Sequence, residues 1–299
     1  MNLCNFVKNI DYHVDNLDID GILSGILINS INPNMKIGGF SNSNDLIYIV
    51  DEANTKNTIQ IDIHTNNINV KSIDQHILFY NNIFNENKIN PNISFGKEWE
   101  RSLNYKYSEK YPFSTALLIL YLLDIDGVNF KFNLKEKVTN DIEIIDIIGT
   151  TDSTFRNFAN SKYSGNCVNW SEKFFKKSSL LNEFFNIIRK MTPNELIIRQ
   201  HRVQNYLSSH FDGYDRKGFN SIENSDIRGI YGFISNILKL DDPMENIAIL
   251  KLNKFKGKRF FLSNLNDIDY SKFNTHAYIF GKNRNNNFSG TIFNKFICR

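Results

Sequence analysis

Acidic residues and a histidine gather near the start of the chain. His13, Asp15, Asp18 and Asp20 lie within eight positions, directly before an apolar run that begins at Gly21. Carboxylates this close repel one another unless a positive charge lies among them. A divalent metal ion is the simplest such charge, because carboxylate and imidazole groups suit hard or borderline ions such as Mn²⁺. The stretch is therefore a candidate metal-binding segment.

The elements around these residues alternate between strand and helix. Apolar runs predict strands over 10–14, 35–40, 58–63 and 70–75, and helices over 21–31, 44–53 and 114–125. This alternation indicates an α/β fold with a mainly parallel sheet flanked by helices. Ligands bind such sheets beyond the carboxyl ends of the strands. We expect His13, Asp62 and Asp74 to converge at that edge, joined by Asp152 from an apolar element over 140–156.

The second half of the chain is more helical. Residues 170–210 carry two amphipathic patterns, the second with Thr192 as N-cap and Pro193 in its first turn. The segment 210–221 is rich in glycine and charge, which indicates a boundary. We predict an N-terminal domain over 1–169, a helical connector over 170–219 and a smaller α/β domain over 220–299.

Composition and charge narrow the functional classes. The chain has 299 residues, 41% of them hydrophobic, which is enough for one large or two moderate domains. A net charge of +3 does not by itself indicate nucleic-acid binding. From Lys251 to the last residue, however, the sequence has ten Lys or Arg and only two acidic residues, both Asp. This excess of positive charge favours either an anionic ligand or a solvated basic face.

Targeting and redox signals point to the cell interior. Three scattered cysteines argue against a disulfide framework and against a zinc site. The N-terminus lacks the pattern of a signal peptide, and the longest apolar run, 116–123, is too short to span a membrane. We expect a soluble, cytoplasmic protein without a membrane partner.

Four segments occur in an order that resembles the DHH phosphoesterase superfamily. They are HVDNLDIDGILSG (13–25), IQIDIH (59–64), SIDQHI (72–77) and IIGTTDSTFR (147–156), with the apolar STALLILYLL (114–123) between the last two. The family includes RecJ-type exonucleases, nano-RNases, cyclic-dinucleotide phosphodiesterases and family II pyrophosphatases. The likeness covers residues 8–160, and KRFFLSNLNDIDYSKF (258–273) weakly resembles part of the associated DHHA1 domain within 220–299.

The resemblance implies a two-metal site. Two Mn²⁺ ions, or alternatively Mg²⁺, activate a water and neutralise phosphate oxygens in such sites. By resemblance, His13 and Asp18 hold one metal, Asp20 and Asp152 hold the other, and Asp62 bridges the two.

The resemblance also implies catalytic and substrate-binding residues. Asp74, Gln75 and His76 stand where the Asp-His-His triplet of the family lies. There Asp74 orients its neighbours and His76 contacts the scissile phosphate. Arg156 ends the fourth segment and joins the implied substrate contacts.

Three departures from the family pattern weaken the implied roles. Four residues rather than three separate His13 from Asp18, so that either the loop bulges or Asp15 substitutes. Gln75 replaces a histidine that normally binds metal, and an amide oxygen is a poorer ligand. The glycine-rich loop that grips phosphate in the C-terminal domain is missing. His276, Lys282 and Arg284 lie in its place and are candidate contacts to a substrate phosphate.

Hypotheses from different classes follow. The first is a Mn²⁺-dependent phosphodiesterase that releases 5′-mononucleotides from short oligonucleotides or single-stranded nucleic-acid ends, with a cyclic dinucleotide as the nearest alternative substrate. The second hypothesis, which the three departures from the family pattern motivate, is a degenerate relative that binds nucleic acid or another partner without hydrolysing it. A pyrophosphatase is a third hypothesis.

Two local alternatives also stay open. Asp20 could simply cap the helix that begins at Gly21. In another register, Asp51 would stand for the second segment, and the third would run from Asp62 to His64.

Overall fold

The structure is a computed structural model. It describes residues 2–42, 46–54, 57–63, 65, 70–76, 86–94, 110–128, 130, 132–245, 247, 252–262, 277–280 and 288–292. Side chains are described up to residue 257, except at 52, 93–94 and 174.

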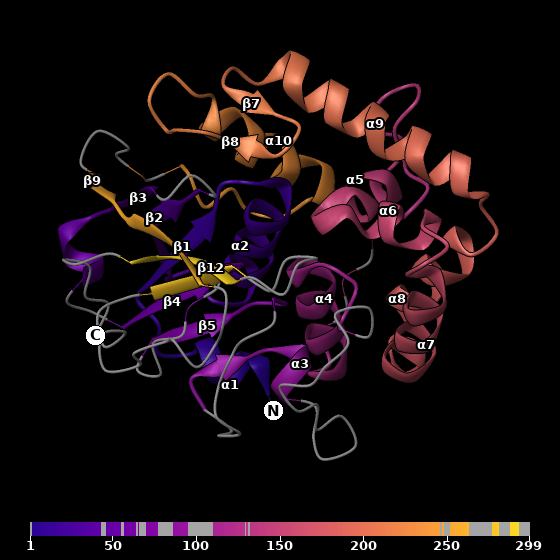
Figure 1. The fold of residues 1–299 in the computed structure, drawn as a ribbon, viewed down its shortest axis with the longest axis horizontal. Helices are drawn as coiled ribbons and strands as arrows, with labels where there is room; N and C mark the ends of the chain where they lie inside the picture. Colours follow the sequence, from indigo (N-terminus) through magenta and orange to yellow (C-terminus); the bar gives the residue numbers. More distant parts are fainter. Residues whose placement is uncertain are drawn as a thin grey trace.

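A seven-stranded, mostly parallel sheet forms the centre of the fold (Figure 1), in the order β6-β5-β4-β1-β2-β3-β9. Its strands are β1 (Tyr12–Asn16), β2 (Lys36–Ser41), β3 (Leu46–Ile49), β4 (Thr58–Ile61), β5 (Lys71–Ile73), β6 (Lys88–Ile89) and β9 (Asn253–Lys256). The pairs from β6 to β2 are parallel, while β3 is antiparallel to both β2 and β9. The predicted α/β class with a mainly parallel sheet and flanking helices is confirmed.

One predicted helix is wrong. Residues 44–53 were expected to be mainly helical, but they contain the strand β3 and the short 3-10 helix η1 (Asp51–Asn54). The run Leu46–Ile49 consists of apolar, β-favouring residues, and three of the four are buried. Pairing with β2 on one side and with the distant β9 on the other decides its conformation.

Two buried helices pack against each other beside the central strand β1. α2 (Ile19–Ile31) follows β1 and packs against both β1 and α4 (Thr115–Ile125). Asp18 is the N-cap of α2 and Ser114 is the N-cap of α4. Both helices are buried along most of their length, as their nearly continuous apolar sequences predict.

A helical layer covers one side of the molecule. Figure 1 shows α4 to α9 gathered to the right of the sheet. After α4, the elements of this layer are α5 (Ile144–Thr150), η4 (Thr151–Ser153), α6 (Thr154–Ala159), α7 (Ser164–Phe174), η5 (Phe175–Lys177), α8 (Ser179–Ile188) and α9 (Pro193–His210). The predicted start of α9 is confirmed, because Thr192 and Glu195 form a capping box. α9 packs on α5 and α6, so the predicted connector contacts the helices on either side of Asp152.

Three further short elements pack around the sheet and its helices: the helices α1 and α3 and a two-stranded hairpin. α1 (Leu3–Val7) packs on α4, and α3 (Pro91–Ser94) follows β6. The hairpin of β7 (Tyr214–Asp215) and β8 (Gly218–Phe219) lies on the loop after β1, since the Phe219 N–H donates to the Leu17 carbonyl at 2.7 Å.

The predicted C-terminal domain begins with elements that pack on the main sheet. α10 (Ile227–Leu238) contacts α2, and β9 extends the sheet beyond β3. A separate antiparallel sheet has the order β10-β12-β11, from β10 (Lys258–Leu262), β11 (Ala277–Phe280) and β12 (Phe288–Ile292). The division into two domains and a connector stays a prediction. Among the described residues, none of the helices has the length and apolar character needed to cross a membrane.

Candidate functional site

Three neighbouring parallel strands end at the same edge of the sheet, each beside a polar residue. β1 ends at Asn16, β4 is followed by Asp62, and β5 is followed by Asp74. The Asn16 side-chain amide donates to Asp18 Oδ2 at 2.9 Å and to Asp62 Oδ2 at 3.1 Å. One neutral side chain therefore joins carboxylates from the first and second sequence segments.

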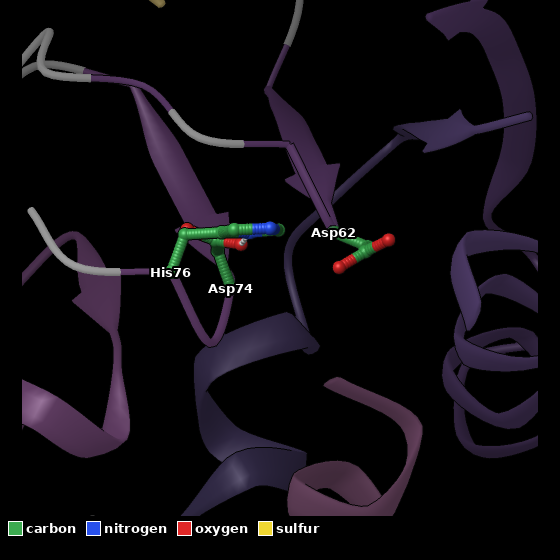
Figure 2. A group of neighbouring side chains, drawn as sticks. All are labelled: Asp62, Asp74 and His76. Atoms are coloured by element: carbon green, nitrogen blue, oxygen red, sulfur yellow. Dashed lines mark hydrogen bonds and ion pairs between the residues drawn. The ribbon is translucent and has the colours of Figure 1, made fainter. Parts of the chain in front are cut away.

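Asp74 and His76 form a close pair beside Asp62. His76 Nδ1 lies 2.6 Å from Asp74 Oδ1, and the side chains are 36% and 1% exposed, respectively. Figure 2 shows the three side chains at the ends of β4 and β5, with the His76 ring extending toward Asp62. Their ligand atoms lie within 4.8 Å of one another. Within the described ranges, this is the one group of acidic, histidine or cysteine side chains compact enough to hold a metal ion.

Asp152 reaches the same place from the kink between α5 and α6. Its φ is 37° and that of Ser153 is 59°, and Asp62 has a φ of 55°. Left-handed backbone is uncommon outside glycine and concentrates at functional sites. The Gln75 amide donates to Asp152 Oδ2 at 2.8 Å. Gln75 thereby joins the third segment to the fourth.

The N-terminus of α4 points into the site. Thr115 Oγ1 donates to Asp62 Oδ1 at 2.8 Å. The backbone N–H groups of Thr115 and Ala116 donate to the two oxygens of Asp20 at 2.9 and 2.8 Å. Unpaired N–H groups at a helix N-terminus favour anions. Asp20 therefore binds the start of α4, and Asp18 rather than Asp20 caps α2.

The loop that carries Gln75 and His76 is fixed by asparagines after β6. The Asn90 amide donates to the His76 carbonyl at 2.6 Å, and the Asn92 amide donates to the Gln75 carbonyl at 2.8 Å. Asn92 Oδ1 accepts in turn from the Tyr111 N–H at 2.8 Å. The backbone of the third segment is held from outside the strand that precedes it.

Burial, and after it the charge of neighbouring carboxylates, raises the pKa of the acidic groups of the site. Burial, together with the charge of Asp152, raises the pKa of Asp18 from 3.8 to about 6. Burial and neighbouring carboxylates raise the pKa of Asp20 and of Asp62 well above the ordinary value. Burial also raises the pKa of Asp152. Such shifts are expected where like charges are buried together.

Two basic groups lie near these carboxylates. Burial lowers the pKa of His76, but the Asp74 carboxylate outweighs burial and raises that pKa to about 9. The charge of Lys110 lowers the pKa of Asp152 and opposes the rise at His76. Lys110 therefore lies within electrostatic reach of both groups.

The donor set fits a hard or borderline divalent cation. Asp62 and Asp74 offer carboxylate oxygens and His76 offers a ring nitrogen. The buried Gln75 Oε1 has no hydrogen-bond partner among the described residues. Oxygen ligands with one imidazole suit Mn²⁺ or Mg²⁺ better than a thiol-preferring ion. The group can therefore bind a divalent metal ion.

His13 lies in a different hydrogen-bonded group from these carboxylates. Its Nδ1 is 2.7 Å from Asp15 Oδ1, and the Tyr231 hydroxyl donates to Asp15 Oδ2 at 2.6 Å. The side chains of His13 and Asp15 are fully buried, and His13 Nε2 has no partner among the described residues. The parallel register of β1 with β2 shifts between His13 and Val14, within the strand, and the choice between a bulged loop and a substitution by Asp15 stays open. Asn16, not His13, is the β1 residue that contacts Asp18 and Asp62.

Of the four residues predicted to contact substrate, the structure describes one. Arg156 lies on the exposed side of α6, and its N–H donates to Gln200 Oε1 at 3.1 Å. His276, Lys282 and Arg284 lie outside the described residues.

The alternative register is also placed only in part. Asp51 is exposed and accepts from the Asn253 amide at 2.7 Å, beside β9 rather than at the carboxyl ends of the strands. His64, which completes that register, lies outside the described residues.

Sequence reasoning missed three polar residues of the site: Asn16, Thr115 and Lys110. Asn16 stands at the end of a predicted strand and Thr115 at the start of a predicted helix, so position alone could have marked both. Lys110 lies in a polar stretch that carries no motif. Comparison of the chain with protein-family models, with curated proteins and with solved structures finds no significant match.

Proposed function

We propose that the protein is a metal-dependent phosphodiesterase. Its substrates would be short oligonucleotides or single-stranded nucleic-acid ends, released as 5′-mononucleotides, and cyclic dinucleotides are the alternative within the same chemistry. The observation that carries the proposal is the meeting of Asp18, Asp62, Asp74 and Asp152, from four separate segments, at one edge of the sheet. These are the segments whose order resembles the DHH phosphoesterase superfamily, and membership of that family is part of the proposal.

The residues that would hold a metal are Asp62, Asp74 and His76. A divalent cation bound there would activate a water and neutralise phosphate oxygens. Asn16 and Thr115 orient the Asp62 carboxylate through the amide and hydroxyl hydrogen bonds. Partners of this kind, one step removed from the metal, commonly set ligand orientation and affinity.

Other residues would orient His76 and attract the negatively charged substrate. Asp74 fixes the orientation of the His76 ring by its contact with Nδ1. Lys110 adds positive charge beside Asp152 and His76, where a phosphate would bring negative charge. The basic C-terminal segment from Lys251 onward would hold the remainder of an anionic substrate.

The test is Mn²⁺-dependent release of mononucleotides from end-labelled short RNA and DNA by the full chain. Asp62→Asn should abolish release, because the carboxylate common to the metal group and to the Asn16 and Thr115 hydrogen bonds loses its charge. Asp51→Asn is the matched control, since Asp51 is exposed and lies away from the site, and it should keep full activity. A well-folded wild type that releases no mononucleotide with Mn²⁺ would contradict the proposal.

One observation favours the non-catalytic alternative. The Gln75 amide donates to Asp152 Oδ2 at the position where the family pattern has a metal-binding histidine. A protein that binds nucleic acid without cleaving it would bind a labelled oligonucleotide equally well before and after Asp62→Asn, with no product in either case. An active phosphodiesterase would lose product on the same substitution.

A further inference from the structure

A hairpin from the second half of the chain lies against the loop that carries Asp18. Its strands β7 and β8 pair antiparallel, and the rings of Tyr214 and Phe219 meet edge to face with their centroids 5.0 Å apart. The Phe219 N–H donates to the Leu17 carbonyl at 2.7 Å. The sequence predicts a boundary over 210–221, and this segment therefore contacts the loop that follows β1.

Gly218 leaves no room for a side chain between the hairpin and this loop. Its φ is 123°, in the region that favours glycine. A Cβ on Gly218 would lie 2.3 Å from the Leu17 carbonyl oxygen and 2.8 Å from the Asp18 Cα. Both of these are backbone atoms, so they can move away only if the loop itself moves. The hairpin thus fixes the backbone of Leu17 and Asp18 by direct contact.

Tyr214 contacts the next residue of the same loop. Its side chain is buried, and its hydroxyl hydrogen-bonds with the N–H of Ile19, the first residue of α2. Burial, and after it the charge of Asp18, raises the pKa of Tyr214. The hairpin therefore contacts three successive residues, from Leu17 to Ile19, with Asp18 in the middle.

Asp18 connects this loop to the proposed metal ligands through Asn16. Asp18 Oδ1 accepts from the N–H groups of Asp20 and Gly21 at 3.0 and 2.9 Å. Asp18 Oδ2 accepts from the Asn16 amide at 2.9 Å, and the same amide donates to Asp62 Oδ2 at 3.1 Å. A shift of the Asp18 backbone would therefore change the hydrogen bonds that orient Asp62.

We propose that the β7–β8 hairpin is part of the site. Gly218 and Tyr214 are positioning residues: they hold Asp18, and through Asn16 they hold Asp62, in the orientation that binds a divalent cation. This inference rests on the proposed function for its metal, and it adds to the site a segment that supplies none of the acidic residues.

The test compares two glycines of the same segment by calorimetric titration of the full chain with Mn²⁺. Gly218→Ala should lower Mn²⁺ affinity by about 10-fold or more, as the loss of support around a metal ligand does. Gly213→Ala is the matched control. Gly213 also has a positive φ, 80°, but a Cβ there would meet Ser225 instead of Leu17 and Asp18. Both variants should lose stability, and equal Mn²⁺ affinities for the two would overturn the inference.

Hydrogen exchange gives a second measurement that does not need the metal. The Asp20 and Gly21 amides donate to Asp18, so their exchange rates report on the position of that carboxylate. Gly218→Ala should speed exchange at both amides more than Gly213→Ala does, and equal rates would contradict the inference. A wild type that binds no Mn²⁺, or binds it and releases no mononucleotide, would contradict the proposed function. If no Mn²⁺ binds, the exchange rates decide the inference alone.

Tyr214→Phe replaces Gly218→Ala if that variant does not fold. It keeps the ring that packs on Phe219 and removes the hydroxyl at the Ile19 N–H. We expect faster exchange at the Ile19 amide and weaker Mn²⁺ binding. Tyr206→Phe on α9 is its control and should change neither. A Tyr214→Phe protein with the Mn²⁺ affinity and the exchange rate of the wild type would overturn the inference.

Discussion

Neutral donors organise the acidic residues of this protein. Asn16, Thr115 and Gln75 each donate to a carboxylate of the cluster, and they come from β1, from the start of α4 and from the loop after β5. A hydrogen bond to a carboxylate orients it and leaves its other lone pairs available. The direction of each carboxylate therefore depends on side chains that carry no charge.

Thr115→Val tests this dependence at a single hydroxyl. The substitution keeps the shape of the side chain and removes the donor to Asp62 Oδ1. We expect Mn²⁺ affinity, measured by calorimetry, to fall by about 10–100-fold, the usual effect of removing a partner one step from the metal.

The matched control for Thr115→Val lies at the start of β4, the strand that Asp62 follows. Thr58 is also buried, and its hydroxyl donates to the Ala53 carbonyl at 2.7 Å at the opposite end of β4. Thr58→Val should lower stability by about 1 kcal/mol, as the loss of a hydrogen bond does, and leave Mn²⁺ affinity unchanged. Equal affinities for the two variants would contradict the role given to Thr115.

At the level of elements, the acidic residues meet because their strands are parallel and adjacent. The sequence predicts β1, β4 and β5 from short apolar runs, and it places Asp62 and Asp74 at the ends of two of them. It also predicts α4 and the N-cap of α9. These features are local in the chain, so they could be found without a structure.

Features set by distant contacts could not be predicted in this way. β3 was expected to be mainly helical, and its strand form depends on β9, which lies about two hundred residues later in the chain. The pairing of the His13 ring with Asp15 also involves a distant residue, because the Tyr231 hydroxyl of α10 donates to the same carboxylate, and metal binding by His13 stays a prediction. Neither contact leaves a pattern near the residue concerned.

The kink between α5 and α6 depends on close packing at Gly149. A Cβ on Gly149 would lie 2.1 Å from Phe155 Cε1, and Phe155 is fully buried. Gly149→Ala therefore overpacks the kink that presents Asp152. We expect it to lower the free energy of unfolding by about 1–3 kcal/mol, measured by urea denaturation.

A double-mutant cycle separates this contact from a general effect on α5. Phe155→Leu makes space beside Gly149 but loses packing of its own. If the clash is the cause, Gly149→Ala should cost less in the Phe155→Leu background than in the wild type. Additive costs would show that Gly149 is required for another reason.

At the scale of the whole molecule, a buried polar contact joins the C-terminal part to the central strand. The Tyr231 hydroxyl on α10 donates to Asp15 on β1 at 2.6 Å, and Asp15 also contacts His13. Tyr231→Phe would leave one oxygen of the buried Asp15 without this donor. We expect a loss of about 1–3 kcal/mol in unfolding free energy, because an unsatisfied buried acceptor costs that much.

The control and the shape of the transition make this a test of the whole fold. Tyr206→Phe on α9 should change stability by less than about 0.5 kcal/mol, as substitutions away from buried networks do. Because α10 packs on α2 and β9 pairs with β3, the Tyr231→Phe protein should still unfold these elements in one transition. If hydrogen exchange showed that α10 unfolds earlier than the central sheet, the prediction of a single transition would be contradicted.

Stability without metal should fall as pH rises. The folded pKa of Asp18 is raised by burial to about 6, above 3.8, so its contribution is fully present below pH 3.8 and is lost as pH passes 6. The folded pKa of His76 lies at about 9, above 6.5, because Asp74 outweighs burial, so its contribution is lost as pH rises toward 9. Both groups release protons over a range in which the metal-free protein weakens.

A divalent cation reverses this trend because it binds the deprotonated groups. Metal competes with protons for carboxylate and imidazole, so its affinity rises with pH. The increase in melting temperature produced by saturating Mn²⁺ should therefore grow from pH 5 to pH 7, as the carboxylates around Asp18 lose their protons. Melting curves at each pH, with and without Mn²⁺, measure this difference directly. Asp62→Asn should remove most of it, whereas a difference that stays constant across the range would mean that the ion binds away from the buried carboxylates.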